Sequence, residues 1–124
     1  MARKKEGVLI TSAILRRAGA CQGFCRTFRR RYPKGVRVTQ EEAERLANSR
    51  MFACLIGVGA KRLLTGDGFK IWLTQSNAVE ALVRCTNYLS PRRFGLSRAA
   101  FNVARASIFA DLLLDPDYRN PVVY

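Results

Sequence analysis

A set of basic side chains, most of them in the first half of the chain, is the clearest chemical feature of this sequence. Most are arginines, whose planar guanidinium group can donate two parallel hydrogen bonds to one phosphate. The chain has 22 Lys and Arg residues against 9 Asp and Glu, and residues 1–62 hold +11 of the net charge of +13. We therefore predict a nucleic-acid or partner interface at Arg16, Arg17, Arg26, Arg29, Arg30, Arg31, Lys34, Arg37, Lys61 and Arg62.

The same charge has a plainer interpretation, in which a solvated basic face only aids solubility. A clustered positive field concentrates phosphate or carboxylate ligands, and the high net charge on 124 residues favours that interpretation. Aromatic residues interleave with the arginines and suit base stacking. Phe28 and Tyr32, however, share a helical stripe with Cys21 and Cys25, which indicates packing in the core instead.

The sequence offers little for catalysis. Histidine, the commonest general acid or base near neutral pH, is absent, and only nine carboxylates are present. We expect no enzymatic activity, no cofactor and no small-molecule substrate. The cysteines are expected to be reduced core residues, and a four-cysteine zinc site is the alternative left open for Cys21, Cys25, Cys54 and Cys85.

The hydrophobic pattern predicts an all-α fold, a compact bundle of about five helices with short turns in a single domain over residues 1–124. Gly19 either separates the first two helices or lies inside one longer helix. Thr39 to Glu42 spell a capping box that starts a helix. The expected helices cover residues 12–17, 20–32, 40–47, 50–64, 77–89 and 98–114, with 50–64 and 98–114 at the centre.

Several segments between the helices have their own predicted form. Residues 1–7 are expected to be a mobile basic arm, Val36–Val38 a short extended connector, and 115–124 an extended tail. Residues 69–73 are ambiguous between one short strand and a lead-in to the next helix. In the helix 77–89, the apolar stripe of Ala78, Leu82, Cys85 and Leu89 is expected to pack inward.

No segment is predicted to cross a membrane. The longest apolar run, Met51 to Ala60, is about half the length that a bilayer requires. We expect a cytoplasmic protein, in the host cell if the chain is viral, or a component of the virion.

The stretch from Ala20 to Leu64 resembles a short domain of unassigned function found in many phage-encoded proteins. An Ala-Cys opens its first helix, aromatic residues follow, and a Tyr-Pro-x-Gly turn leads through a valine-rich connector to a capped helix and a closing Leu-Leu. Here these features are Ala20-Cys21, Phe24, Phe28, Tyr32-Pro33-Lys34-Gly35, Val36-Arg37-Val38-Thr39, Glu42 and Leu63-Leu64. The resemblance covers about a third of the chain and implies a viral or mobile-element origin without assigning any chemistry.

Together these features predict a small basic binding protein that contacts nucleic acid, or a nucleoprotein assembly, through phosphates and independently of base sequence. The alternative is a virion structural protein, or a viral inhibitor or adaptor, that docks its basic face on an acidic host protein complex. The sequence distinguishes neither DNA from RNA nor one oligomeric state from another.

Overall fold

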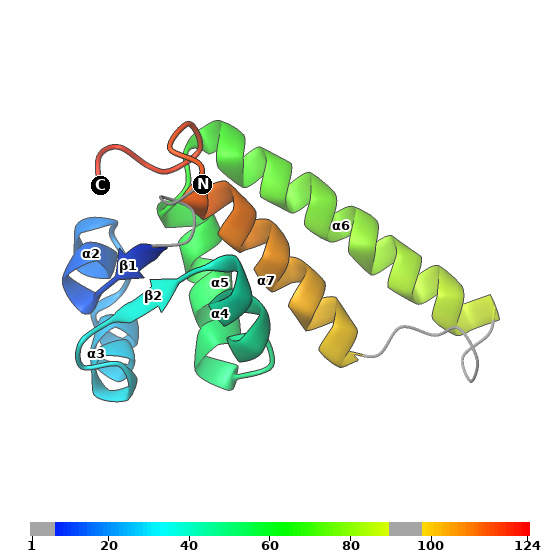
Figure 1. Ribbon diagram of the computed structural model, residues 1–124, viewed down its shortest axis with the longest axis horizontal. Coiled ribbons are helices and arrows are strands. Elements are labelled where there is room, and N and C mark those ends of the chain that lie inside the picture. Colours follow the sequence, from blue (N-terminus) through cyan, green and yellow to red (C-terminus); the bar gives the residue numbers. More distant parts are fainter. Residues whose placement is uncertain (1–6, 90–97) are drawn as a thin grey trace.

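The computed structural model describes residues 7–89 and 98–124, so the predicted arm at residues 1–7 lies outside the described residues except for Gly7. Within this part the chain forms six helices and one two-stranded antiparallel sheet (Figure 1). The elements are β1 (Val8–Ile10), α2 (Ser12–Arg17), α3 (Gln22–Arg31), β2 (Val36–Val38), α4 (Gln40–Leu46), α5 (Arg50–Arg62), α6 (Gly66–Leu89) and α7 (Arg98–Leu114). The mostly helical architecture is as predicted, with the sheet as an addition.

The first and third helices, α2 and α4, begin close to where the sequence predicts. Thr11 precedes α2, and its hydroxyl accepts a hydrogen bond from the backbone N–H of Ile14 at 3.2 Å. Thr39 does the same for α4, accepting from the N–H of Glu42 at 3.0 Å. The Glu42 carboxylate, expected to bond back to Thr39, instead accepts two hydrogen bonds from Arg45 at 2.8 Å. Each threonine satisfies a backbone donor that the first helical turn leaves unpaired.

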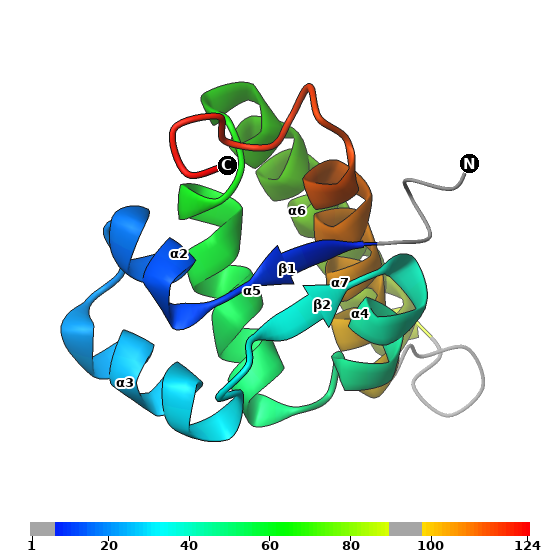
Figure 2. The same cartoon turned by 60° about the vertical axis from the view of Figure 1, so that its left-hand side comes forward.

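The segment Val36–Val38 is a paired strand rather than a free connector. It lies antiparallel to β1, with Val8 opposite Val38 and Ile10 opposite Val36, as Figure 2 shows between the helices. Its valines are buried while Arg37 between them is exposed, which is the alternation of a strand with one face on a core. The pairing was missed because it joins segments that are distant in sequence.

A glycine turn brings β2 against β1. The N–H of Gly35 donates to the carbonyl of Tyr32 at 2.9 Å, which closes the predicted turn after α3. Gly35 has a φ of +83°, and a Cβ there would lie 2.6 Å from the backbone oxygen of Ile10. Only glycine combines this left-handed conformation with such close approach to the neighbouring strand.

Residues 69–73 are helical, and the suggestion of a strand there is wrong. They belong to α6, which starts near Thr65, whose hydroxyl accepts from the N–H of Gly68 at 3.0 Å. Ser76, which directly precedes the helix predicted at 77–89, is instead buried within α6. The helix therefore has 24 residues and begins about three turns earlier than predicted.

The predicted inward stripe of α6 faces solvent. Ala78, Leu82 and Cys85 are exposed, and Leu82 retains 54% of its accessible surface. Trp72, at 6%, and Ser76 lie on the buried side, because α7 packs along that side of the helix. The side chain of Leu89, the last member of the stripe, lies outside the described residues.

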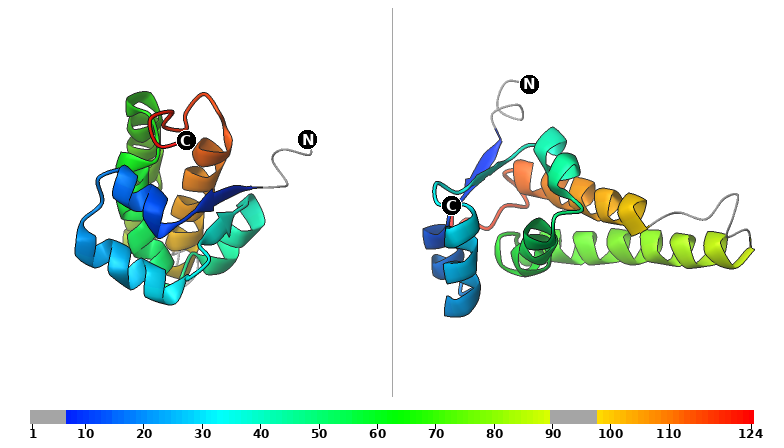
Figure 3. Two further views of the ribbon diagram at one scale, coloured as in Figure 1. Left: turned by 90° about the vertical axis from the view of Figure 1, so that its left-hand side faces the viewer. Right: turned by 90° about the horizontal axis from the view of Figure 1, so that it is seen from below.

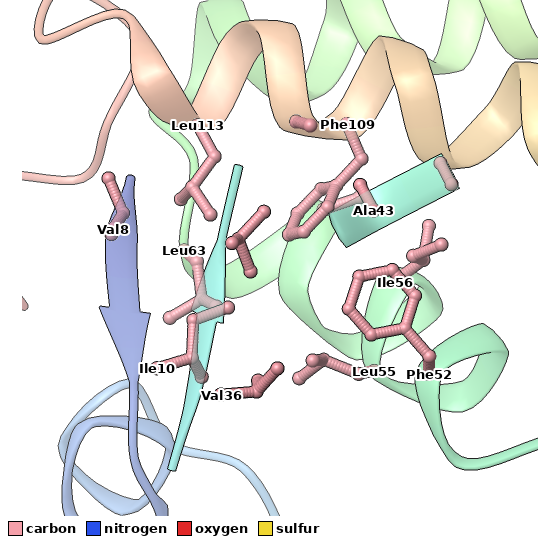
Figure 4. Packing of buried hydrophobic residues seen from close by; sticks show 14 of the residues in the cluster. Val8, Ile10, Val36, Ala43, Phe52, Leu55, Ile56, Leu63, Phe109 and Leu113 are labelled. Atoms are coloured by element: carbon pink, nitrogen blue, oxygen red, sulfur yellow. The ribbon is translucent and has the colours of Figure 1, made fainter. Parts of the chain in front are cut away.

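The core lies where α7 meets α4 and α5. The apolar composition of α5 and α7 predicted their central place, whereas the contribution of α4, which is largely charged, was not predicted. Figure 4 shows Phe109 and Leu113 of α7 above Leu63 and Ile56, with Ile10 of the sheet closing the other side. A Cβ at position 59 would lie 2.9 Å from the Phe109 ring, so glycine there permits close packing of α5 against α7.

The segment 115–124 folds back on the domain instead of extending from it. Asn120 donates from its backbone N–H to the carbonyl of Leu63 and from its side chain to the carbonyl of Arg62, both at 2.9 Å. Val123 is buried at 3% exposure, and the backbone of Arg119 forms an isolated antiparallel β-bridge with that of Leu64. The segment thus satisfies carbonyls that the C-terminal end of α5 leaves free.

These contacts give the molecule two unequal parts. Helices α2 and α3 lie at one end beside the sheet, while α6 and α7 run side by side away from them, as Figure 3 shows from below. Within residues 7–89 and 98–124, no helix has the length and apolar character needed to span a bilayer.

Candidate nucleic-acid interface

Four of the predicted basic residues come together around one surface hollow. The hollow has a volume of about 390 Å³ and is formed by α2, α3 and the turn after α3. Its lining residues are Arg16, Gln22, Cys25, Arg26, Arg29, Arg30 and Pro33, and we call it the arginine hollow.

The spacing along α3 explains how this helix contributes three arginines. Arg29 and Arg30 follow Arg26 by three and four residues, which places both on the same face of the helix as Arg26. Arg16 comes from α2, which packs against α3. Sequence periodicity indicates that the three arginines of α3 share a face, but only the packing of α2 on α3 adds Arg16.

The arginine hollow has an excess of positive charge. Among the described residues, its lining includes four arginines and no carboxylate. The two ion pairs that the described residues form among themselves, Arg45 with Glu42 and Arg84 with Glu80, each lie within one helix elsewhere. Guanidinium groups crowded in this way repel one another, so an anion bound between them lowers the electrostatic energy. Phosphate suits them because each guanidinium can donate to two of its oxygens.

Two of the predicted residues hold the fold together instead of lining the hollow. Arg17 donates to the carbonyl of Val123 at 3.3 Å and so holds the C-terminal segment. Arg62 donates to the carbonyl of Ala18 at 3.3 Å, which joins the end of α5 to the end of α2. Their positive charge still contributes to the field at this end of the molecule.

The other predicted residues lie outside the arginine hollow. Lys34 is exposed in the turn after α3, Arg37 is exposed on β2, and Lys61 is exposed near the end of α5. Arg31, although adjacent to Arg30, points to a different side of α3. Its guanidinium carbon lies 5.9 Å from the centre of the Tyr32 ring.

Arg31 lines a second hollow of about 450 Å³ between α3 and α5. Arg50, the first residue of α5, also lines it, together with Cys54 and Met51. Arg50 was not predicted as an interface residue, because nothing in the local spacing relates the start of α5 to α3. The one sequence signal that could have identified it is its place as a basic residue at the start of a predicted helix.

The aromatic residues of α3 are packing residues, as the stripe predicts. Phe28 is fully buried, and its ring centre lies 6.4 Å from that of Phe24 and 5.3 Å from that of Tyr32. Phe28 therefore has no free face for a base, and Phe24 and Tyr32 are partly buried against the core.

The cysteines are only partly where the sequence places them. Cys25 is buried, but Cys21, Cys54 and Cys85 are exposed, so the prediction of four core cysteines is wrong for these three. Cys21 precedes α3 and its sulfur accepts from the N–H of Phe24 at 3.4 Å, which explains why it leaves the stripe. Within the described residues, no three cysteines or carboxylates gather in an arrangement that could hold a metal ion.

Comparison with family models, with curated proteins and with solved structures finds no match to this chain. The fold therefore defines the class to which the protein can be assigned, a mostly helical domain with a small antiparallel sheet and an arginine-rich end. The resemblance of residues 20–64 to a phage-encoded domain stays a prediction.

Proposed function

We propose that the protein binds nucleic acid through its phosphate backbone at the arginine hollow, without reading the base sequence. The supporting observation is the convergence of Arg16, Arg26, Arg29 and Arg30 on one hollow whose lining has no carboxylate. Phosphate contacts provide affinity and register but carry no base information, which fits a hollow whose charged lining residues, among those described, are all arginines.

The test is binding of labelled random-sequence DNA and RNA, followed by fluorescence anisotropy over a series of salt concentrations. We expect the logarithm of the affinity to fall linearly with the logarithm of the salt concentration, with a slope set by the number of phosphates contacted. Changing Arg29, Arg30 and Arg31 together to Ala should weaken binding, because two of the three line the hollow. The slope should become shallower by about one for each phosphate contact that is lost.

A matched control separates the hollow from net charge. The triple change Arg45→Ala, Lys70→Ala and Arg84→Ala removes the same charge from exposed positions on α4 and α6. We expect this variant to bind almost as well as the unchanged protein. Equal weakening in both triple variants would show that net charge alone governs binding and would reject the hollow as the site.

A single change refines the assignment. Arg31→Ala alone should have a smaller effect than Arg29→Ala, because Arg31 lies in the second hollow. If the unchanged protein fails to bind DNA or RNA even at low salt, the proposal is wrong. The same basic face would then be tested against an acidic protein complex, whose docking should survive moderate salt.

A further inference from the structure

A separate hollow between α6 and α7 also contains two arginines. It has a volume of about 260 Å³, and we call it the inter-helix hollow. Its lining includes Trp72, Ser76 and Asn77 from α6, and Arg98, Phe101 and Arg105 from α7. None of these residues belongs to the interface proposed above.

The aromatic rings hold both guanidinium groups beside this hollow. The guanidinium carbon of Arg105 lies 5.0 Å from the centre of the Trp72 ring and 5.7 Å from that of Phe101. The guanidinium carbon of Arg98 lies 5.1 Å from the same Phe101 ring. Cation–π contacts of this kind position the arginines without neutralising their charge.

The local charge balance favours an added anion. Glu80 is the one carboxylate among the described lining residues, and its oxygen already lies 2.9 Å from a nitrogen of Arg84. Burial lowers the pKa of Arg105, and the neighbouring charge of Arg98 lowers it further while Glu80 partly opposes the shift. A negative group in the hollow would stabilise both guanidinium groups.

Uncharged donors lie in the same lining. Ser76 is 6% exposed and Asn77 is exposed at the same side of α6. The indole N–H of Trp72 is buried and has no acceptor among the described residues. An unpaired buried donor costs free energy until an acceptor reaches it. The set provides more donors than the two oxygens of a carboxylate can use, whereas phosphate provides a third and fourth oxygen.

We propose that the inter-helix hollow binds a phosphate group. Arg98 and Arg105 supply the charge, and the amide of Asn77, the hydroxyl of Ser76 and the indole N–H of Trp72 supply further donors. The rings of Phe101 and Trp72 form the apolar wall. This site is independent of the arginine hollow, so either proposal can fail without the other.

Trp72 makes the proposal directly measurable, because it is the one tryptophan in the chain. Inorganic phosphate is titrated into the purified protein while Trp72 fluorescence is recorded, and sodium chloride at matched ionic strength serves as the reference. A bound phosphate should shift the Arg105 guanidinium over the indole and produce a saturable change in emission. A change that is the same in chloride, or that never saturates, would overturn the proposal.

Variants identify the site. Arg98→Gln should raise the phosphate concentration at half-saturation at least about tenfold, because a charged hydrogen-bond donor is lost. Arg98 is exposed and its guanidinium lies over the Phe101 ring, whereas the guanidinium over Trp72 is that of Arg105, so the reporter and the fold should be retained. The matched control, Arg29→Gln, changes the arginine hollow and should leave the Trp72 response unaltered. An unaltered response in Arg98→Gln would reject the site.

Oligonucleotides decide where the phosphate comes from. The same random-sequence oligonucleotide is compared with and without a 5′-phosphate, using Trp72 emission in the Arg29→Gln background. A response that requires the 5′-phosphate supports the site and identifies the end of a nucleic acid as its ligand. A response to inorganic phosphate alone supports the site and identifies a small phosphate compound.

Discussion

The guanidinium group of Arg62 packs closely against the backbone at Gly19. One guanidinium nitrogen of Arg62 donates to the carbonyl of Ala18 at 3.3 Å, and a Cβ at position 19 would lie 2.8 Å from that nitrogen. Gly19 has a φ of +90°, so it combines a left-handed conformation with close approach to a charged side chain. The sequence places Arg62 among the candidate phosphate-binding residues, but its hydrogen bond joins the end of α5 to the end of α2.

Arg62→Ala should lower the free energy of unfolding by about 1–3 kcal/mol, because a charged hydrogen bond to a half-buried carbonyl is lost. Its neighbour Lys61 is exposed, and Lys61→Ala should change that free energy by less than about 0.5 kcal/mol. Urea denaturation of both variants measures the difference. Equal stability of the two variants would contradict the structural role of Arg62.

Leu112→Ala should lower the free energy of unfolding by about 2–5 kcal/mol, because Leu112 is buried in α7 and its removal leaves a cavity. Leu82→Ala provides the comparison, since Leu82 is 54% exposed on α6 and should cost less than about 0.5 kcal/mol. Thermal denaturation followed by circular dichroism measures both. A large loss at Leu82 would mean that the predicted stripe, and not the opposite side of α6, packs inward.

Asn120→Ala should destabilise the domain by about 1–2 kcal/mol, because the side chain donates to the Arg62 carbonyl and accepts from the N–H of Val122. Val122 is 80% exposed, so Val122→Ala should have almost no effect. Limited proteolysis at the C-terminus, together with urea denaturation, tests whether the segment loosens. Resistance equal to that of the unchanged protein would show that this segment does not depend on Asn120.

Tyr124 should make stability depend on alkaline pH. Tyr124 keeps 40% of its accessible surface, but partial burial of its phenol raises the pKa to about 12, with the charge of Arg119 partly opposing the shift, against about 10 in an unfolded chain. The folded state therefore holds the phenol proton more tightly, so the stabilisation is complete below about pH 10 and is lost as the pH rises towards about 12. Tyr124→Phe, which cannot ionise, should lose less stability over that range in urea denaturation. A steeper loss in Tyr124→Phe than in the unchanged protein would contradict this assignment.

The sequence by itself determined the features that depend on neighbouring residues. Thr11 and Thr39 cap helices that the pattern predicts, and the spacing of Arg26, Arg29 and Arg30 places them on one face of α3. Charge, helix starts and the apolar character of α5 and α7 are local or compositional properties. The capped starts of α2 and α4 follow from such local signals, whereas the start of α6, about three turns earlier than predicted, does not.

Tertiary structure decided the features that join distant segments. Pairing of Val36–Val38 with β1, burial of the Trp72 side of α6, and the separation of Arg31 from Arg30 all depend on which element packs alongside. The same packing assigns Arg62 to the fold and brings Arg16 to the arginine hollow. A helical stripe states which residues share a face, but only the energy of packing against a second element decides whether that face is buried.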